Sequence, residues 1–265
     1  MRHPIFIVLL FLCTTGLLSC QSGRSQNDVI VAGSTSIQPF ADKWAEVFME
    51  TRPALGVSVQ GGGSSAGIQA CKSGACQIGM SSRELKADEK DLHETVIARD
   101  GLAIIVHPSN PVRGAKLSEV KQIFAGDLTN WKFLGGPDRE ITVVTREEGS
   151  GTRGAFQELV MGKTRIFRGA ITEDSNGTVR EIIANDPHAI GFISLGLVNE
   201  QVRALALDGV EGSEASIRAG RYKLVRPFLF LTRGEPTGAA KAFIDFVLSD
   251  EGQALVKKEG LIPVK

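Results

Sequence analysis

The sequence predicts an α/β protein in which short strands alternate with helices. Short apolar runs recur from residue 29 onward, and Gly/Ser/Thr turns followed by apolar residues at helical spacing separate them. This alternation favours mostly parallel sheets with helices packed on their faces. In such sheets, ligands bind where the carboxyl ends of strands lead into helix N-termini.

The individual elements follow from these patterns in chain order. The expected strands are Val29–Ala32, Val57–Val59, Gln77–Met80, Gly101–His107, Ile141–Thr145, Ile190–Ile193 and Leu224–Leu231. The first expected helix has its apolar face at Ile37, Phe40, Trp44, Val47 and Phe48. A second helix is expected to begin at Gly61–Ser65 and to end at about Lys72. Further helices are expected over Leu117–Phe124, Thr152–Met161, Val179–Ala184 and Gly238–Val256, and the last of these is broken near Ser249.

The N-terminus is typical of an export signal. Arg2 precedes the apolar stretch Ile5–Leu12, and Leu17-Leu18-Ser19-Cys20 resembles the lipobox of bacterial lipoproteins, in which the cysteine becomes the lipidated first residue. An ordinary transmembrane anchor is the alternative, but the apolar core is shorter than the roughly 20 residues that span a bilayer. We therefore predict a signal peptide over residues 1–20, a polar tether over 21–27, and a lipid-anchored protein of the bacterial cell envelope that faces the periplasm or the cell exterior.

Composition narrows the function classes. Hydrophobic residues make up 42% of the chain and charged residues 23%, which is ordinary for a globular protein. Lys+Arg and Asp+Glu are both 30, so no overall basic field attracts nucleic acid. Beyond the signal, the chain is long enough for one large domain or two smaller lobes. We expect a monomer.

Two cysteines remain after the signal and the lipidated Cys20. An oxidising compartment permits a disulfide between Cys71 and Cys76, and two small buried thiols are the alternative. A zinc site is disfavoured because these cysteines and the scattered histidines supply too few clustered ligands. We expect no metal and no cofactor.

Three segments place hydroxyls and glycines at the start of an expected helix. They are Gly33-Ser34-Thr35-Ser36, Gly61-Gly62-Gly63-Ser64-Ser65 and Gly149-Ser150-Gly151-Thr152. A helix N-terminus has unpaired N–H groups and a partial positive charge, so it favours anions. One such segment alone is explained by ordinary helix capping. Three segments that follow strands in one α/β chain indicate that the helix starts converge on one cleft.

The third segment also carries arginines. Arg146 lies at a strand end, and a guanidinium can grip a tetrahedral oxyanion with two hydrogen bonds. Arg153 lies inside the expected helix, where we expect it to face solvent. Together the three segments and Arg146 predict an oxyanion site.

These motifs resemble those of phosphate ABC-transporter substrate-binding proteins of the PstS type. Arg146-Glu-Glu-Gly-Ser-Gly-Thr152 is similar to the signature loop of that family, and the resemblance runs from about residue 29 to the C-terminus. The other similar motifs, in the same order, are Gly33–Ser36, Gly61–Ser65, Ile78–Ser82 and Ser175–Thr178 with Ala189–Phe192.

The resemblance implies a type II periplasmic binding protein fold, with two α/β lobes, a hinge and a ligand cleft between the lobes. It implies lobe one at 28–103 and 226–265 and lobe two at 104–225. It also implies a non-enzymatic protein that binds inorganic phosphate and delivers it to the permease subunits of a transporter. The implied ligand-binding residues are Ser34, Thr35, Ser64, Ser65, Ser82, Arg146, Glu148, Ser150, Gly151 and Thr152.

One position departs from the family pattern. The resemblance implies an aspartate after the third strand that accepts the proton of hydrogen phosphate, but this chain has Ser82 there. Glu148 matches another position that is acidic in the family, where it pairs with the arginine and can face the ligand. Either Glu148 or the Ser82 hydroxyl accepts the proton, or sulfate is rejected less strongly. Arg83 is either a second positive contact or an exposed turn residue.

Other functions are less well supported by the residues. Another tetrahedral oxyanion (sulfate, tungstate or phosphonate) is the nearest alternative ligand. An exported phosphoester hydrolase would need an activated nucleophile, but Gly149-Ser150-Gly151 is not a Gly-x-Ser-x-Gly elbow, and no histidine has an evident role as its base. A sensory or adhesive role is a third alternative.

Overall fold

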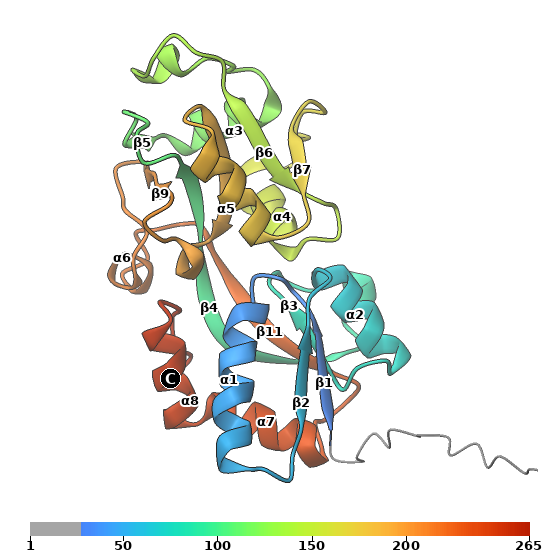
Figure 1. The fold of residues 1–265 in the computed structure, drawn as a ribbon. Helices are drawn as coiled ribbons and strands as arrows, with labels where there is room; N and C mark the ends of the chain where they lie inside the picture. The colour runs from blue at the N-terminus through green and yellow to red at the C-terminus, as the bar shows by residue number, and fades with distance from the viewer. Residues whose placement is uncertain (1–27) are drawn as a thin grey trace, which may run out of the picture.

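The computed structural model describes residues 28–265, which form two α/β lobes joined by the long strands β4 and β11 (Figure 1). The predicted signal peptide, Cys20 and the tether lie outside the described residues. The strands are β1 Val29–Gly33, β2 Val57–Gln60, β3 Ile78–Ser81, β4 His93–Val106, β5 Gly114–Ala115, β6 Thr142–Arg146, β7 Ile171–Glu173, β8 Ala189–Ser194, β9 Arg203–Ala204, β10 Ala206–Leu207 and β11 Val225–Thr232.

The α-helices are α1 Gln38–Thr51, α2 Ser64–Ser73, α3 Leu117–Ala125, α4 Gly151–Phe156, α5 Asn176–Asn185, α6 Glu214–Arg218, α7 Gly238–Leu248 and α8 Asp250–Lys258. A π-helical turn, Gln157–Met161, continues α4. Short 3-10 turns cover Ala87–Glu89, Trp131–Leu134 and Leu195–Leu197. Among residues 28–265, no helix is long and apolar enough to cross a bilayer.

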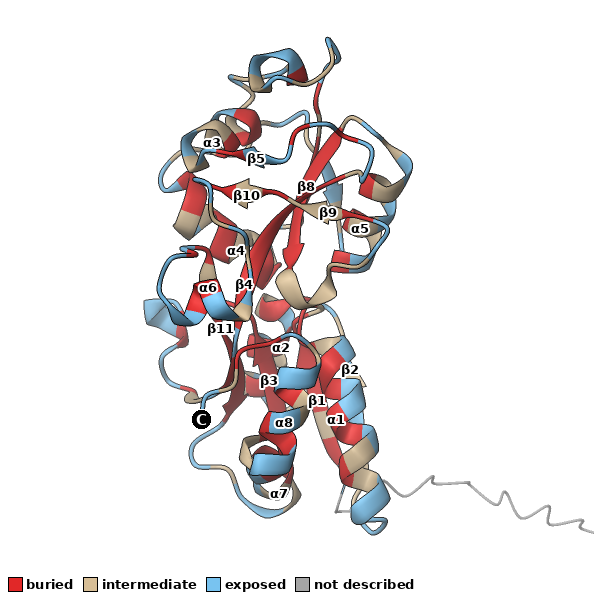
Figure 2. Cartoon of the chain, turned by 90° about the vertical axis from the view of Figure 1, so that its left-hand side faces the viewer, coloured by how far each residue is buried: buried red, intermediate tan, exposed pale blue. Residues whose placement is uncertain are grey.

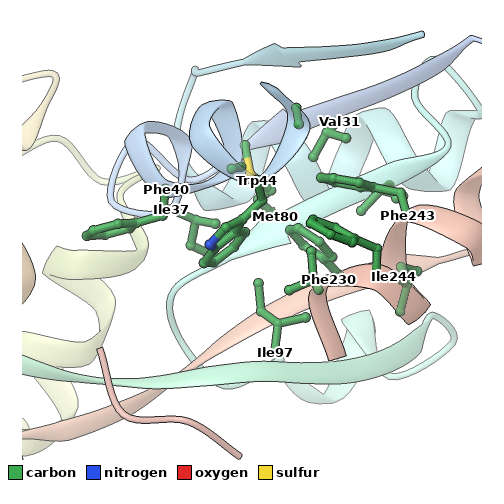
Figure 3. Close-up of a cluster of buried hydrophobic side chains, with 14 of the residues drawn as sticks. Val31, Ile37, Phe40, Trp44, Met80, Ile97, Phe230, Phe243 and Ile244 are labelled. Atoms are coloured by element: carbon green, nitrogen blue, oxygen red, sulfur yellow. The ribbon is translucent and has the colours of Figure 1, made fainter. Parts of the chain in front are cut away.

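The first lobe is built on the parallel strands β2, β1 and β3. Spacing of the apolar residues predicted the buried face of α1, and the structure confirms it: Phe40 and Trp44 are buried. Trp44 packs edge-on against Phe230 of β11, which stacks on Phe243 of α7 (Figure 3). Burial of each such side chain contributes about 1.5–3 kcal/mol, so this core fixes α1 and the loop before it.

The second lobe is built on β8, β6 and β7, which are also parallel. Its core brings together Phe124 of α3, Phe156 of α4 and Phe192 of β8. The Phe156 and Phe192 rings stack with centroids 4.1 Å apart, and the Phe124 centroid lies 4.6 Å from that of Phe156. This packing holds α4 against β8 and so fixes the loop between β6 and α4.

The central strands correct the expectation of mostly parallel sheets. β11 runs antiparallel to β3 and β4, and β4 runs antiparallel to β8. β4 begins at His93 instead of Gly101, because its first half pairs with β11. Residues His93-Glu94-Thr95 are polar, so the pattern of apolar runs did not predict that half of the strand.

The two lobes have separate cores along these strands. Ala98 of β4 packs in the core of the first lobe and Leu102 in that of the second. Figure 2 shows the central strands buried and the outer helix faces exposed. The lobe boundaries at 28–103, 104–225 and 226–265 stay a prediction.

Candidate functional site

Three loops that lead from strands into helices meet where the two lobes face each other. They are the β1–α1 loop with Ser34 to Ser36, the β2–α2 loop ending at Gly63, and the β6–α4 loop ending at Ser150. Ser34 Oγ accepts hydrogen bonds from the Ser36 and Ile37 amides at 3.2 and 3.4 Å. Ser150 Oγ accepts one from the Arg153 amide at 3.2 Å, so it is the N-cap of α4.

The hydroxyls of the first lobe form a buried cluster. Ser34 Oγ donates to Ser82 Oγ at 2.9 Å, and Ser64 Oγ lies 3.4 Å from Ser82 Oγ. Ser64 Oγ also accepts a hydrogen bond from the Ser82 amide at 3.1 Å. The structure therefore brings together three of the predicted ligand residues from three different segments.

Direct contacts join the two lobes across the site. The Ser36 and Thr152 hydroxyl oxygens are 2.6 Å apart, and the Ser65 amide donates to Gly149 O at 3.0 Å. A Cβ at Gly151 would lie 2.1 Å from Ser64 Oγ, so only glycine allows this approach. These contacts hold the two lobes against each other at the site.

Arg146 is the buried cation of the site, with only 1% of the residue exposed. Its Nη2 donates to Thr35 Oγ1 of the other lobe at 3.2 Å and to Asp174 O at 2.6 Å. Its Nε donates to Glu147 Oε2 and to Glu173 O, both at 3.1 Å. Its Nη1 is buried and has no hydrogen-bond partner among the described residues.

Burial dominates the electrostatics of this guanidinium. Desolvation lowers the pKa of Arg146 from its ordinary value, the charge and hydrogen bond of Glu147 raise that pKa, and the nearby charge of Arg226 lowers it. An unpaired nitrogen on a buried cation is unfavourable unless an acceptor meets it. An oxyanion supplies such an acceptor.

Contrary to what the resemblance implied, Glu148 does not pair with Arg146. Glu147, the neighbouring residue, makes the ion pair with Arg146. The Glu148 side chain is 92% exposed and lies 3.8 Å from the Arg153 guanidinium, at the surface. Two adjacent loop residues point in different directions, so only one of them can face the arginine.

The structure corrects the expectation for Arg153 and excludes one of the two alternatives for Arg83. Arg153 is only partly exposed, and its Nη1 donates to Arg146 O at 2.8 Å. Arg83 is buried and forms a two-bonded ion pair with Glu89 at 2.7 and 2.9 Å. Arg83 Nη2 also lies 3.4 Å from Ser65 Oγ, so Arg83 is not an exposed turn residue.

The two cysteines lie at the far end of α2 and before β3, away from the site hydroxyls. Of the two alternatives, the structure has buried free thiols in place of a disulfide. A hydrogen bond from Cys76 lowers the pKa of Cys71 to about 7, while that bond and burial raise the pKa of Cys76. The Cys71 thiol also donates to Leu231 O at 3.3 Å.

A second buried network lies beside the site, and none of the sequence motifs predicts it. Arg226 of β11 pairs with Asp100 of β4 at 2.8 Å, and both are 2% exposed or less. Asn176 Nδ2 donates to Ser36 Oγ at 2.9 Å, and Ser194 Oγ donates to Asp100. One sequence feature could have indicated this network: Arg226 is a charged residue inside the apolar run Val225-Arg-Pro-Phe-Leu-Phe-Leu.

The arrangement is suited to binding an anion. Hydroxyls and guanidiniums supply donors for a tetrahedral oxyanion. Among residues 28–265, no group of three or more His, Cys, Asp or Glu side chains is placed to hold a metal ion. The site hydroxyls hydrogen bond to other hydroxyls, amides and arginines, and no histidine is among their recorded partners.

The comparisons with known proteins agree with this geometry. Residues 20–251 match the PBP superfamily domain. The phosphate-binding protein PstS of Bacillus subtilis is 37% identical over 249 residues, which cover 91% of this chain and 82% of that protein.

Solved structures show the same fold. One is a crystal structure with bound phosphate from Clostridium perfringens, assigned as a phosphate ABC transporter substrate-binding protein. It superposes with a TM-score of 0.88 at 43% identity and covers 90% of this chain and all of that one. An ABC-type phosphate transport receptor from Vibrio cholerae gives a TM-score of 0.74 at 36% identity, covering 88% and 99%. The chain therefore belongs to the PstS-type family of phosphate-binding proteins within the PBP superfamily.

Proposed function

We propose that this protein binds inorganic phosphate between its two lobes and delivers it to the permease subunits of an ABC transporter. The observation that carries the proposal is the buried Arg146, whose Nη1 has no partner among residues 28–265. Thr35 of the other lobe accepts a hydrogen bond from this cation. The names of its relatives support phosphate as the anion.

The proposed ligand-binding groups come from both lobes, so phosphate would be enclosed by closure. In the first lobe they are Ser34, Thr35, Ser64, Ser65 and Ser82, and in the second Arg146, Ser150, Gly151 and Thr152. Glu148 is not among them, because its side chain points to solvent. The other proton-acceptor candidate is Ser82, whose Oγ accepts from Ser34 and also lies 3.4 Å from Ser64 Oγ.

We place the protein in the cell envelope as a lipid-anchored monomer, with Cys20 as the lipidated residue. The apolar start of the sequence and its Leu-x-Ser-Cys motif support this placement. Cys20→Ser should release the protein from the membrane fraction and remove the lipid mass from its N-terminus. An unchanged membrane fraction would contradict anchoring through Cys20.

The direct test is calorimetric titration of residues 21–265 with phosphate. We expect one phosphate per chain and a loss of affinity of roughly 10²–10³ in Arg146→Ala, because losing a buried hydrogen-bonded charge costs about 2–5 kcal/mol. Arg168→Ala, an exposed arginine of the same lobe, is the control and should bind like the parent. If Arg146→Ala binds as tightly as the parent, the site is elsewhere.

Two further measurements test the alternative ligands and the alternative hydrolase function. Displacement of phosphate by equimolar sulfate, tungstate or phosphonate would make another oxyanion the ligand. Turnover of a chromogenic phosphate ester by the purified parent, absent in Arg146→Ala, would indicate a hydrolase. We expect neither result.

A further inference from the structure

Arg226 has the features of a binding residue, although none of the sequence motifs includes it. It is 2% exposed, and its Nε and Nη2 both donate to Asp100 Oδ2, at 3.0 and 2.8 Å. Nη2 also lies 3.3 Å from Ser36 Oγ, to which it donates. Its Nη1 is buried without a partner among residues 28–265, as is that of Arg146.

The two arginines converge on neighbouring residues of one loop. Arg146 of β6 donates to Thr35, and Arg226 of β11 donates to Ser36. Each has its own carboxylate, Glu147 or Asp100, on one edge of the guanidinium. In Arg226 the edge that faces Asp100 is formed by Nε and Nη2, so Nη1 lies on the other side of the planar group.

Each of the two buried guanidiniums has a nitrogen that its own carboxylate does not meet, and an anion that reaches both nitrogens would remove the cost of leaving them unpaired. The geometry points to Arg226 as a second guanidinium of the anion site, positioned by Asp100, which selects a dianionic tetrahedral ligand such as HPO₄²⁻ over H₂PO₄⁻. This inference rests on the proposed phosphate-binding function. It explains how a site with Ser82 in place of an aspartate favours the dianion over the monoanion, because a second guanidinium adds positive charge and no aspartate adds negative charge. The ligand proton still distinguishes HPO₄²⁻ from sulfate.

The hydrogen-bond directions around Ser36 support a binding role. Ser36 Oγ accepts from Arg226 Nη2 and from Asn176 Nδ2, and these nitrogens can only donate. Asn176 has this orientation because its Oδ1 accepts from the Ser194 amide at 3.2 Å. Because both lone pairs of Ser36 Oγ are used, Ser36 donates its hydrogen to Thr152 Oγ1. The two oxygens are 2.6 Å apart. The Thr152 hydrogen is then left to donate to a ligand.

The test compares phosphate affinity of the parent with that of two variants of the pair. Asp100→Asn combined with Arg226→Gln removes both buried charges together, so neither is left unpaired. Arg226→Lys keeps the charge opposite Asp100 but loses the fork of donors. Arg203→Gln is the matched control, because Arg203 also has a buried, unpartnered Nε, but its other nitrogens bind the Pro108, Asn110 and Val112 carbonyls of the second lobe.

Titrations are run from about pH 5 to pH 8, with circular dichroism and thermal melts to establish folding. The charged groups facing Arg226 are Asp100 on β4, whose pKa burial raises above its ordinary value, and Arg146 on β6. The ligand titrates in this range, and Arg226→Lys, which keeps Asp100, separates the titration of the ligand from that of Asp100. We expect parent affinity to rise as HPO₄²⁻ replaces H₂PO₄⁻. The double variant should lose at least about a hundredfold in affinity and most of this pH dependence. Arg226→Lys should lose about tenfold, and Arg203→Gln should bind like the parent.

Each outcome decides one point. A folded double variant whose Kd stays within about threefold of the parent overturns the inference, as does a uniform loss with an unchanged pH profile, which would indicate a purely structural pair. If the double variant does not fold, Arg226→Lys decides, and an unchanged Kd for it overturns the inference. A parent that binds no phosphate would contradict the proposed function itself.

Discussion

Ser36 of the first lobe and Thr152 of the second share a hydrogen bond across the cleft, with their hydroxyl oxygens 2.6 Å apart. Ser36 precedes α1 and Thr152 lies in the first turn of α4, so the contact joins two helix starts that are far apart in the chain. Because each residue belongs to a different lobe, the bond forms only when the lobes are closed. It therefore links closure to the residues proposed to hold the ligand.

Thr152→Val should weaken phosphate binding by roughly tenfold to a hundredfold. Valine preserves the shape but removes the hydroxyl, and a lost hydrogen bond to a charged group costs about 1.5–3 kcal/mol. Calorimetric titration measures the change. Thr129→Val, at an exposed position of the same lobe, should bind like the parent. Equal affinity for Thr152→Val would remove Thr152 from the site.

Gly151→Ala should prevent closure. The added Cβ would lie 2.1 Å from Ser64 Oγ and 2.6 Å from Ser82 Oγ, both in the opposite lobe. Relief of such overpacking costs about 1–3 kcal/mol, so we expect the phosphate Kd to rise roughly tenfold to a hundredfold.

The thermal stability of the Gly151→Ala protein without phosphate should change little, because the lobes can open. Gly177→Ala is the matched control, since a Cβ there meets only Ser175 Oγ, at 3.6 Å. Full affinity in Gly151→Ala would show that the closed contact is not needed for binding.

Glu147→Gln should tighten phosphate binding by roughly threefold to tenfold. The carboxylate beside Arg146 opposes the charge of an incoming anion, while Thr35, Glu173 O and Asp174 O continue to hold the guanidinium. Glu148→Gln should have no effect, because that side chain is exposed. Titration at low salt compares the two. Weaker binding in Glu147→Gln would mean that Glu147 acts mainly by orienting Arg146.

Glu89→Gln should destabilise the protein in a pH-dependent way. A hydrogen bond from Arg83 holds the pKa of Glu89 below its ordinary value of 4.5. A carboxyl group with a lowered folded-state pKa stabilises the protein above that ordinary value, and the stabilisation is lost as pH falls through the folded-state pKa.

The stability difference between parent and Glu89→Gln should therefore be about 3–5 kcal/mol near neutral pH and shrink below about pH 4.5. Urea unfolding at several pH values measures it, with the exposed Glu200→Gln as the control. A difference that is constant with pH would mean that Glu89 and Arg83 do not form this pair in solution.

Much of the fold follows from local sequence. Apolar spacing identified the buried face of α1 through Phe40 and Trp44, and short apolar runs identified β1, β2, β3, β6, β8 and β11. The break between α7 and α8 near Ser249 was also predicted from the sequence. Serine is a common helix N-cap, and Ser249 caps α8 in the structure. These features depend on neighbouring residues only, so periodicity and capping are enough to predict them.

The grouping of some of these residues was predictable for the same reason. Hydroxyl-rich helix starts and Arg146 are local motifs, and Ser34, Ser64, Ser82 and Thr152 do lie together. Glu147 and Glu148 show the limit of that reasoning. Both sit in the same motif, and only the direction of the folded loop decides that Glu147 meets Arg146 while Glu148 faces solvent.

The sequence alone determined the α/β class, the family resemblance and the hydroxyl-rich helix starts, because each depends on residues that are neighbours in the chain. Only the tertiary structure decided the antiparallel pairing of β4 with β11, and with it the meeting of Asp100 and Arg226. Those two residues are far apart in the chain and have no local motif. Their pairing depends on the register of two strands, which long-range packing sets, and not on the residues beside them.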